Sequence, residues 1–110
     1  MTPLPAPGPA DVHAALDRIV PTADPLRVVV FGSVGRGEAV SGSDLDLLVV
    51  MPDGTDRRAA TVELLVSLAD LGVPKDVVVM MPAYAALHRD SGWHVVGAAL
   101  RDGRTVYARS

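Results

Sequence analysis

Cysteine is absent from the 110-residue sequence, which excludes disulfide bonds and any zinc or iron–sulfur site with cysteine ligands. The longest apolar runs, residues 28–31 and 47–51, fall far short of the roughly 20 residues that a membrane-spanning helix needs. The first ten residues contain no positive side chain, so no secretory signal is expected. A net charge of −3 offers no basic face for nucleic acid or anionic membrane. Together these absences favour a cytoplasmic protein.

The remaining composition is typical of one folded domain. Hydrophobic residues make up 49% of the chain and charged residues 21%, which is too apolar for a disordered chain. Prolines alternate through the first nine residues and favour an extended conformation there. We therefore expect a flexible tail over residues 1–9 and one domain over residues 10–110.

Hydrophobic periodicity predicts alternating helices and strands. Helices are expected over residues 11–20, from 55 or 56 to about 71, in a stretch opened by Pro82, and over 93–101; strands are expected over 26–31, 45–51, 76–81 and 105–108. This order predicts an α/β fold, with a small mixed sheet of three to four strands and helices packed against it.

Two helix boundaries and one helix face follow from the same pattern. Asp11 is expected to cap the first helix and Pro21 to end it, because proline lacks the N–H that the helix needs. In the helix that begins near Asp56, an apolar face at helical spacing is expected to turn toward the core. Its members are Val62, Leu65, Val66 and Ala69.

Asp44 and Asp46 stand two residues apart at the start of the predicted strand 45–51. Because side chains alternate along a strand, both carboxylates are expected on one face, with Cα atoms about 7 Å apart. Two carboxylates beside an apolar interior repel each other and lose hydration, so that one takes a proton or a cation joins them. A hard divalent cation such as Mg²⁺ suits these oxygen ligands.

Asp76 opens the next predicted strand and extends this hypothesis. If the two strands are neighbours, three carboxylates meet at one edge and can hold two metal ions about 3.5–4 Å apart, which clamps a phosphoryl group. Asp76 would then accept a proton from an attacking hydroxyl. The alternative is an ordinary residue at the start of a strand, paired with Lys75.

Gly32 and Ser33 follow the first predicted strand. Glycine allows the backbone to approach a phosphate closely, and nearby N–H groups and the serine hydroxyl can donate to it. Arg36 either adds a charge-assisted phosphate contact or pairs with Glu38. Phosphate donors beside metal-binding carboxylates indicate a nucleoside triphosphate site.

These residues resemble the nucleotidyltransferase superfamily related to DNA polymerase β, whose signature is Gly-Ser, a spacer, and Asp-x-Asp with apolar flanks. The closer resemblance is to minimal nucleotidyltransferases, the MntA-like antitoxins, which read roughly Gly-Ser-x-Ala-Arg-Gly-Glu before Ser-Asp-x-Asp-Leu. This chain has Gly35 in place of the customary alanine, which is expected to loosen the turn. Asp76 matches the third carboxylate of the family, and the resemblance covers about residues 10–108.

The resemblance implies the polymerase β-like fold and transfer of AMP from ATP with Mg²⁺. It implies that Gly32 and Ser33 bind the triphosphate, that Asp44 and Asp46 bind metal, and that Asp76 binds metal and activates the acceptor hydroxyl. Family members of this size are commonly antitoxins that neutralise a HEPN-domain toxin by adenylylating a tyrosine. A HEPN-domain toxin is therefore the expected partner.

Two other functions stay open. One is a nucleotidyltransferase with a small-molecule acceptor, and the other is a non-catalytic module that silences its partner by docking.

Three common sequence motifs do not fit this chain. A P-loop requires a lysine after its second glycine, but Lys75 is the only lysine. A dinucleotide-binding fingerprint lacks its third glycine at Val40, and Phe31 stands where a nucleophile elbow requires glycine.

Overall fold

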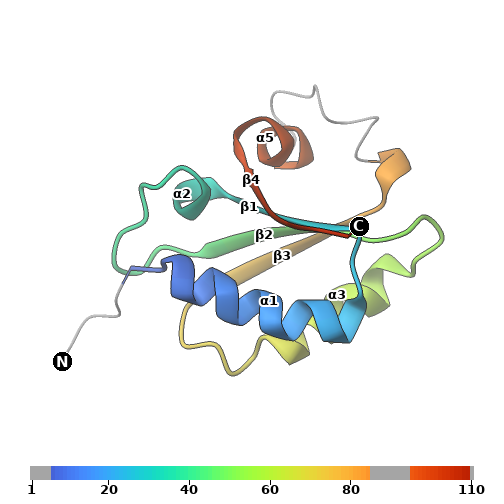
Figure 1. The fold of residues 1–110 in the computed structure, drawn as a ribbon, viewed down its shortest axis with the longest axis horizontal. Helices are drawn as coiled ribbons and strands as arrows, with labels where there is room; N and C mark the ends of the chain where they lie inside the picture. The colour runs from blue at the N-terminus through green and yellow to red at the C-terminus, as the bar shows by residue number, and fades with distance from the viewer. Residues whose placement is uncertain (1–5, 85–94, 110) are drawn as a thin grey trace.

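A four-stranded mixed sheet forms the centre of the structure, a computed structural model that describes residues 6–84 and 95–109 (Figure 1). The strand order is β3-β2-β1-β4, with β2 and β3 parallel and the other neighbours antiparallel. The elements are α1 (Pro9–Ala23), β1 (Arg27–Phe31), α2 (Gly32–Gly35), β2 (Leu45–Val50), α3 (Arg57–Ser67), β3 (Lys75–Met80), α5 (Val95–Asp102) and β4 (Arg104–Ala108). The predicted α/β class with a small mixed sheet is confirmed.

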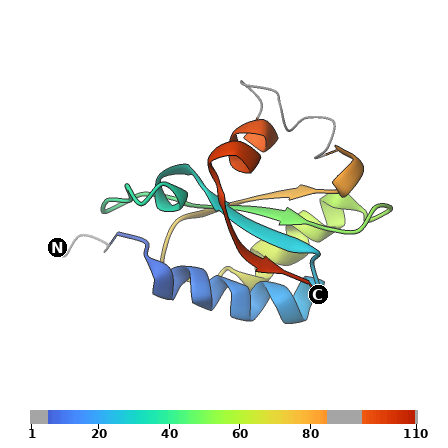
Figure 2. The ribbon, with the colours of Figure 1, turned by 45° about the horizontal axis from the view of Figure 1, so that its top comes forward.

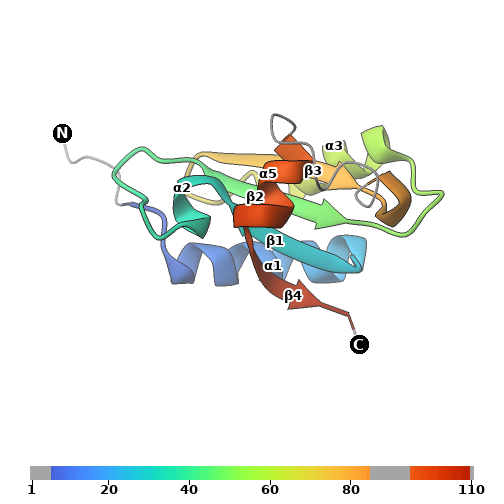
Figure 3. The ribbon, with the colours of Figure 1, turned by 90° about the horizontal axis from the view of Figure 1, so that it is seen from above.

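Helices cover both faces of the sheet. Figure 1 shows α1 and α3 below the sheet and α5 above it, Figure 2 shows α1 and α5 on opposite sides of it, and α5 packs on β1 (Figure 3). Along β2, Leu45, Leu47 and Val49 join the apolar cluster on the α1 and α3 side. Leu48 and Val50 join the cluster on the α5 side. This alternation confirms the face assignment predicted for the strand.

Helix α1 is longer at both ends than the sequence predicts. Pro9 is its first residue, a position where the missing N–H costs nothing because a first-turn N–H has no helical partner. Asp11 does not begin the helix but accepts a hydrogen bond from the Gly8 N–H at 2.8 Å. Pro21 lies in the last turn rather than ending the helix, which closes where Asp24 takes a φ of 48°.

Helix α3 turns a different face to the sheet from the one predicted. Its buried residues are Ala60 and Leu64, and buried Leu68 follows at the same spacing. The four residues expected to be buried are instead exposed, so this prediction was wrong. The apolar residues of α3 form two stripes on opposite sides of the helix, and periodicity alone does not choose between them. The exposed stripe contains Val62, Leu65, Val66 and Ala69.

The remaining boundaries follow the predictions with small differences. Asp56 caps α3 by accepting a hydrogen bond from the Ala59 N–H at 3.1 Å, but the helix ends at Ser67, before the predicted residue 71. Helix α5 ends before Gly103 as expected, whereas the predicted start at Trp93 lies outside the described residues. Within the described ranges, every helix is too short or too polar to cross a membrane.

Candidate active site

The parallel pairing of β2 with β3 places Asp46 directly opposite Asp76. Neighbouring strands lie about 4.8 Å apart, so the two carboxylates start from adjacent backbone positions. Each acid stands two residues before a member of the cluster under α5, Leu48 on β2 and Val78 on β3, and residues two apart share a face of a strand. Both acids therefore face the α5 side of the sheet, and the expected neighbourhood of these two strands is confirmed.

Asp44 lies immediately before β2 and is exposed, as is Asp76, while Asp46 is half-buried. The charges of Asp44 and Asp76 both act on Asp46. Within residues 6–84 and 95–109, no three acidic or histidine side chains converge closely enough to form a ready metal-ligand group. The carboxylate oxygens of Asp46 and Asp76, which are paired across the strands, and of Asp44 are nevertheless of the kind that a divalent cation such as Mg²⁺ prefers.

The pKa of Asp46 is raised above its ordinary value. Burial is the main cause, and the negative charges of Asp44 and then Asp76 add to it. Arg36 acts in the opposite direction and lowers the pKa, which places its positive charge near the carboxylate. The site therefore holds a carboxylate whose charged form is unfavourable without a cation.

Gly32 packs against the Asp46 carboxylate at the junction of β1 and α2. Its φ of 64° lies in the left-handed region that favours glycine. A Cβ at this position would overlap Oδ2 of Asp46 and lie 3.2 Å from its Cγ. A glycine is thus required at position 32 both by the backbone conformation and by the close approach of the carboxylate.

Gly35 has a different role from the looser turn expected of it. A Cβ at this position would lie 2.6 Å from the backbone oxygen of Val30 and 3.0 Å from its carbon. The absence of a side chain lets α2 pack directly onto the end of β1. Ser33, half-buried in α2, accepts a backbone hydrogen bond from the Glu38 N–H at 2.8 Å.

Arg36 forms an ion pair with Glu38, at 3.3 Å between Nε and Oε2. This is one of the two expectations for Arg36, and it does not test the phosphate contact. The pair is exposed, so a ligand with a denser negative charge can compete for the guanidinium.

Ser43 closes the turn that leads into Asp44, although it was not among the expected site residues. The Ser43 hydroxyl accepts from the Val40 N–H at 2.9 Å, and the Ser43 N–H donates to the Val40 carbonyl at 2.9 Å. Gly42 lies inside this turn with a φ of 85°. The Ser-Gly-Ser sequence before the acids was the available signal, since serine and glycine favour such turns.

The alternative role of Asp76, a residue paired with Lys75, is not what the structure contains. Lys75 instead donates a hydrogen bond from Nζ to the Leu71 carbonyl at 3.1 Å. Among the described residues, Asp76 has no ion-pair partner. Its exposed carboxylate is therefore available to a ligand.

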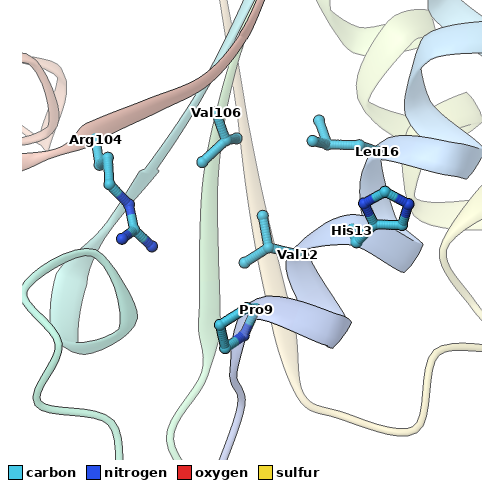
Figure 4. A pocket seen from close by; sticks show the side chains of 6 residues that line it. All are labelled: Pro9, Val12, His13, Leu16, Arg104 and Val106. Atoms are coloured by element: carbon cyan, nitrogen blue, oxygen red, sulfur yellow. The ribbon is translucent and has the colours of Figure 1, made fainter.

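A hollow of about 310 Å³ lies between α1 and β4, on the other side of the sheet (Figure 4). Val12 and Val106 belong to the apolar cluster on the α1 and α3 side, whereas Asp46 faces the α5 side. The hollow is therefore separate from the acidic site. It is lined by Pro9, Val12, His13, Leu16, Arg104 and Val106.

Comparison with known proteins gives one family match and one structural likeness. A family model described as a nucleotidyltransferase domain matches residues 13–103. No relative was found among curated proteins. A solved structure described as a crystal structure of the toxin-antitoxin with AMP-PNP has a chain that is 19% identical, with a TM-score of 0.49. The match covers 92% of this chain and 73% of that chain, and a likeness at this level does not identify a ligand or partner.

Proposed function

This chain belongs to the nucleotidyltransferase domain family, and from that premise we propose that it transfers AMP from ATP to a hydroxyl group of a partner protein. The observation that carries the proposal is the register of β2 and β3, which sets Asp46 opposite Asp76. Gly32 and the backbone after it adjoin Asp46. This closeness supports the proposal, because transfer from a triphosphate needs carboxylates beside a backbone that a phosphate can approach closely.

Asp44, Asp46 and Asp76 are the residues that we propose hold Mg²⁺, as two ions when the nucleotide is bound. Their oxygen donors fit this cation, and burial together with the charges of Asp44 and Asp76 raises the pKa of Asp46, which a bound cation would offset. Bound Mg²⁺ supplies positive charge that stabilises the triphosphate and the carboxylates together.

The chain's own residues bind, orient and deprotonate the reactants. Gly32 allows close approach of the triphosphate, and Ser33 and Arg36 donate hydrogen bonds to its oxygens. The acceptor oxygen attacks the α-phosphorus as the bond to pyrophosphate breaks. Asp76, which is exposed, takes the proton of the attacking hydroxyl, and pyrophosphate leaves with the electrons of the broken bond.

The acceptor that we propose is a HEPN-domain toxin, because the Gly-Ser-x-x-Arg-Gly-Glu and Ser-Asp-x-Asp segments resemble those of minimal nucleotidyltransferases that modify such toxins. Asp44 and Asp76 are exposed, which lets a macromolecule present its hydroxyl directly to the acids. A small-molecule acceptor is the competing hypothesis, and it requires an enclosing pocket for its substrate.

The test is incubation with α-phosphate-labelled ATP, Mg²⁺ and the protein encoded by the adjacent gene. We expect label on that protein and little on the chain alone. Asp44→Asn with Asp46→Asn should lower labelling by at least about 100-fold, because each carboxylate supports the charge stabilisation of the transition state. Asp17→Asn, an exposed acid on α1, is the matched control and should retain activity.

Three results would contradict parts of this proposal. Label on a low-mass product and not on protein would favour a small-molecule acceptor. Neutralisation of the partner by the doubly substituted variant, without any labelling, would favour silencing by docking. Equal labelling by the wild type and the doubly substituted variant would exclude these acids as the metal ligands.

A further inference from the structure

The outer face of α3 is apolar although it faces solvent. Val62 is 58% exposed, Leu65 is 41% exposed and Val66 is 70% exposed. Ala59 extends the same exposed face toward the start of α3, and exposed Ala69 lies in the turn that follows the helix. Contiguous exposed apolar residues on a helix are unusual in a monomer and mark a contact surface.

The spacing on this face is that of a helix seam. Ala59, Val62 and Val66 of α3 follow one another at intervals of three and four residues, which is the spacing of a heptad seam between paired helices. Position 58 on one flank of the seam is arginine, and position 63 on the other flank is glutamate. The two charged residues are five positions apart in the sequence, which is the spacing at which flanking residues of two parallel helices meet.

Both charges are available in the part of the chain that the structure describes. Arg58 and Glu63 are exposed, and neither has an ion-pair partner there. Asp70, on the same flank as Glu63, is already paired with Arg18 of α1 at 2.8 Å. Glu63 is thus the carboxylate on that flank that a second molecule can use.

A surface hollow of about 550 Å³ lies on the arginine flank of the seam. It is lined by Arg57, Arg58, Thr61 and Val62. The two guanidinium groups suit a carboxylate side chain from another molecule, whereas the Thr61 hydroxyl already donates to the Arg57 carbonyl at 2.7 Å. The charge of the hollow therefore complements Glu63 of another copy.

We propose that α3 pairs in parallel with α3 of a second copy of this chain about a two-fold axis. Val62 and Val66 form the centre of the contact, and each Arg58 meets Glu63 of the other copy. A two-fold axis makes this ion pair twice, because the same patch serves both molecules. An antiparallel pair would instead bring the two glutamate flanks together, and like charges there are unfavourable.

The pairing leaves the acidic site uncovered and does not rest on the proposed function. Helix α3 lies on the opposite side of the sheet from α5, whereas Asp46 and Asp76 face the α5 side (Figures 1 and 2). Because α3 spans only 11 residues, the contact is smaller than a standard interface. We expect a weak, reversible dimer whose population depends on the protein concentration.

Sedimentation velocity of the full chain from about 5 to about 500 μM tests the dimer, because its population must rise with concentration. Val66→Glu should weaken association at least about tenfold, since it places a charge in the apolar centre of the contact. Val40→Glu is the matched control: Val40 is 65% exposed and lies outside α3, so association should not change.

A charge-reversal cycle tests the parallel arrangement and does not depend on the apolar seam. Arg58→Glu and Glu63→Arg should each weaken the dimer, and the two substitutions together should restore it. A chain that stays monomeric over the whole concentration range would overturn the proposal. This holds even if α3 is then found to bind a different protein. A dimer that is insensitive to Val66→Glu, or a double variant that is not restored, would overturn it as well.

Discussion

Asp46 carries a carboxylate in surroundings that disfavour its charge. It is half-buried beside two other acids, and this environment raises its pKa. Gly32 packs so closely against the carboxylate that no larger residue fits there. Such a group destabilises the fold when charged, and active sites commonly retain destabilising groups that bind a ligand.

Asp46→Asn should stabilise the metal-free protein at neutral pH by up to about 1 kcal/mol, a small effect because the carboxylate is partly solvated. A raised pKa means that the folded state binds the proton more tightly than the unfolded state. Wild-type stability therefore falls as pH rises from the ordinary aspartate range through the raised pKa. Thermal unfolding from acidic to neutral pH measures this.

The difference between the two proteins should vanish below the ordinary pKa of aspartate, where the carboxyl group is neutral in both states. Asp17→Asn serves as the control, because Asp17 is an exposed acid on α1, away from Asp46. A variant that is less stable than wild type at neutral pH would contradict this account of Asp46.

At the scale of the secondary-structure element, α3 carries two apolar stripes that are almost equally hydrophobic. One contains Leu64 and is buried against the sheet, and the other contains Leu65 and faces solvent. These two leucines are neighbours in the chain but differ completely in environment. Substituting each leucine in turn therefore tests which face of α3 packs against the sheet.

Leu64→Ala should destabilise the protein by about 2–5 kcal/mol, because it removes a fully buried side chain and leaves a cavity. Leu65→Ala should cost less than about 1 kcal/mol under conditions where the chain is monomeric, since that side chain is 41% exposed. Urea unfolding at low protein concentration measures both. Equal losses, or a larger loss for Leu65, would show that α3 is rotated from the orientation described.

At the scale of the whole molecule, the sheet joins two strands whose acids are distant in sequence. Strand β2 leads into α3, and α3 leads into β3, which lies parallel to β2. A parallel pair needs such a crossover, because the chain must return to the same edge before the second strand begins. A ligand that bridges Asp46 and Asp76 therefore binds the folded chain and not the unfolded one.

Mg²⁺ should raise the unfolding temperature of the wild type by about 5 °C when its concentration is tenfold above the dissociation constant. Asp46→Asn should lose most of this response, because one bridging carboxylate is gone. Asp17→Asn should keep it. A wild type that does not respond to Mg²⁺, with and without ATP, would contradict the assignment of these acids as metal ligands.

The sequence by itself determined the class of fold and the family. Apolar runs predicted the four strands, and Gly32-Ser33 with Asp44 and Asp46 predicted the family, because these signals depend only on residues near one another in the chain. Asp76 could be named from its position at the start of a strand. Its place beside Asp46 was conditional on a pairing that local sequence does not specify.

Only the tertiary structure decided which surfaces meet. The Leu64 stripe of α3 is buried against the sheet while the Leu65 stripe faces solvent, and Gly35 lies against the Val30 carbonyl. The tertiary structure also placed Asp76 opposite Asp46. Periodicity reports how apolar residues repeat around a helix or strand, but the free energy of packing depends on partners that come from distant parts of the chain.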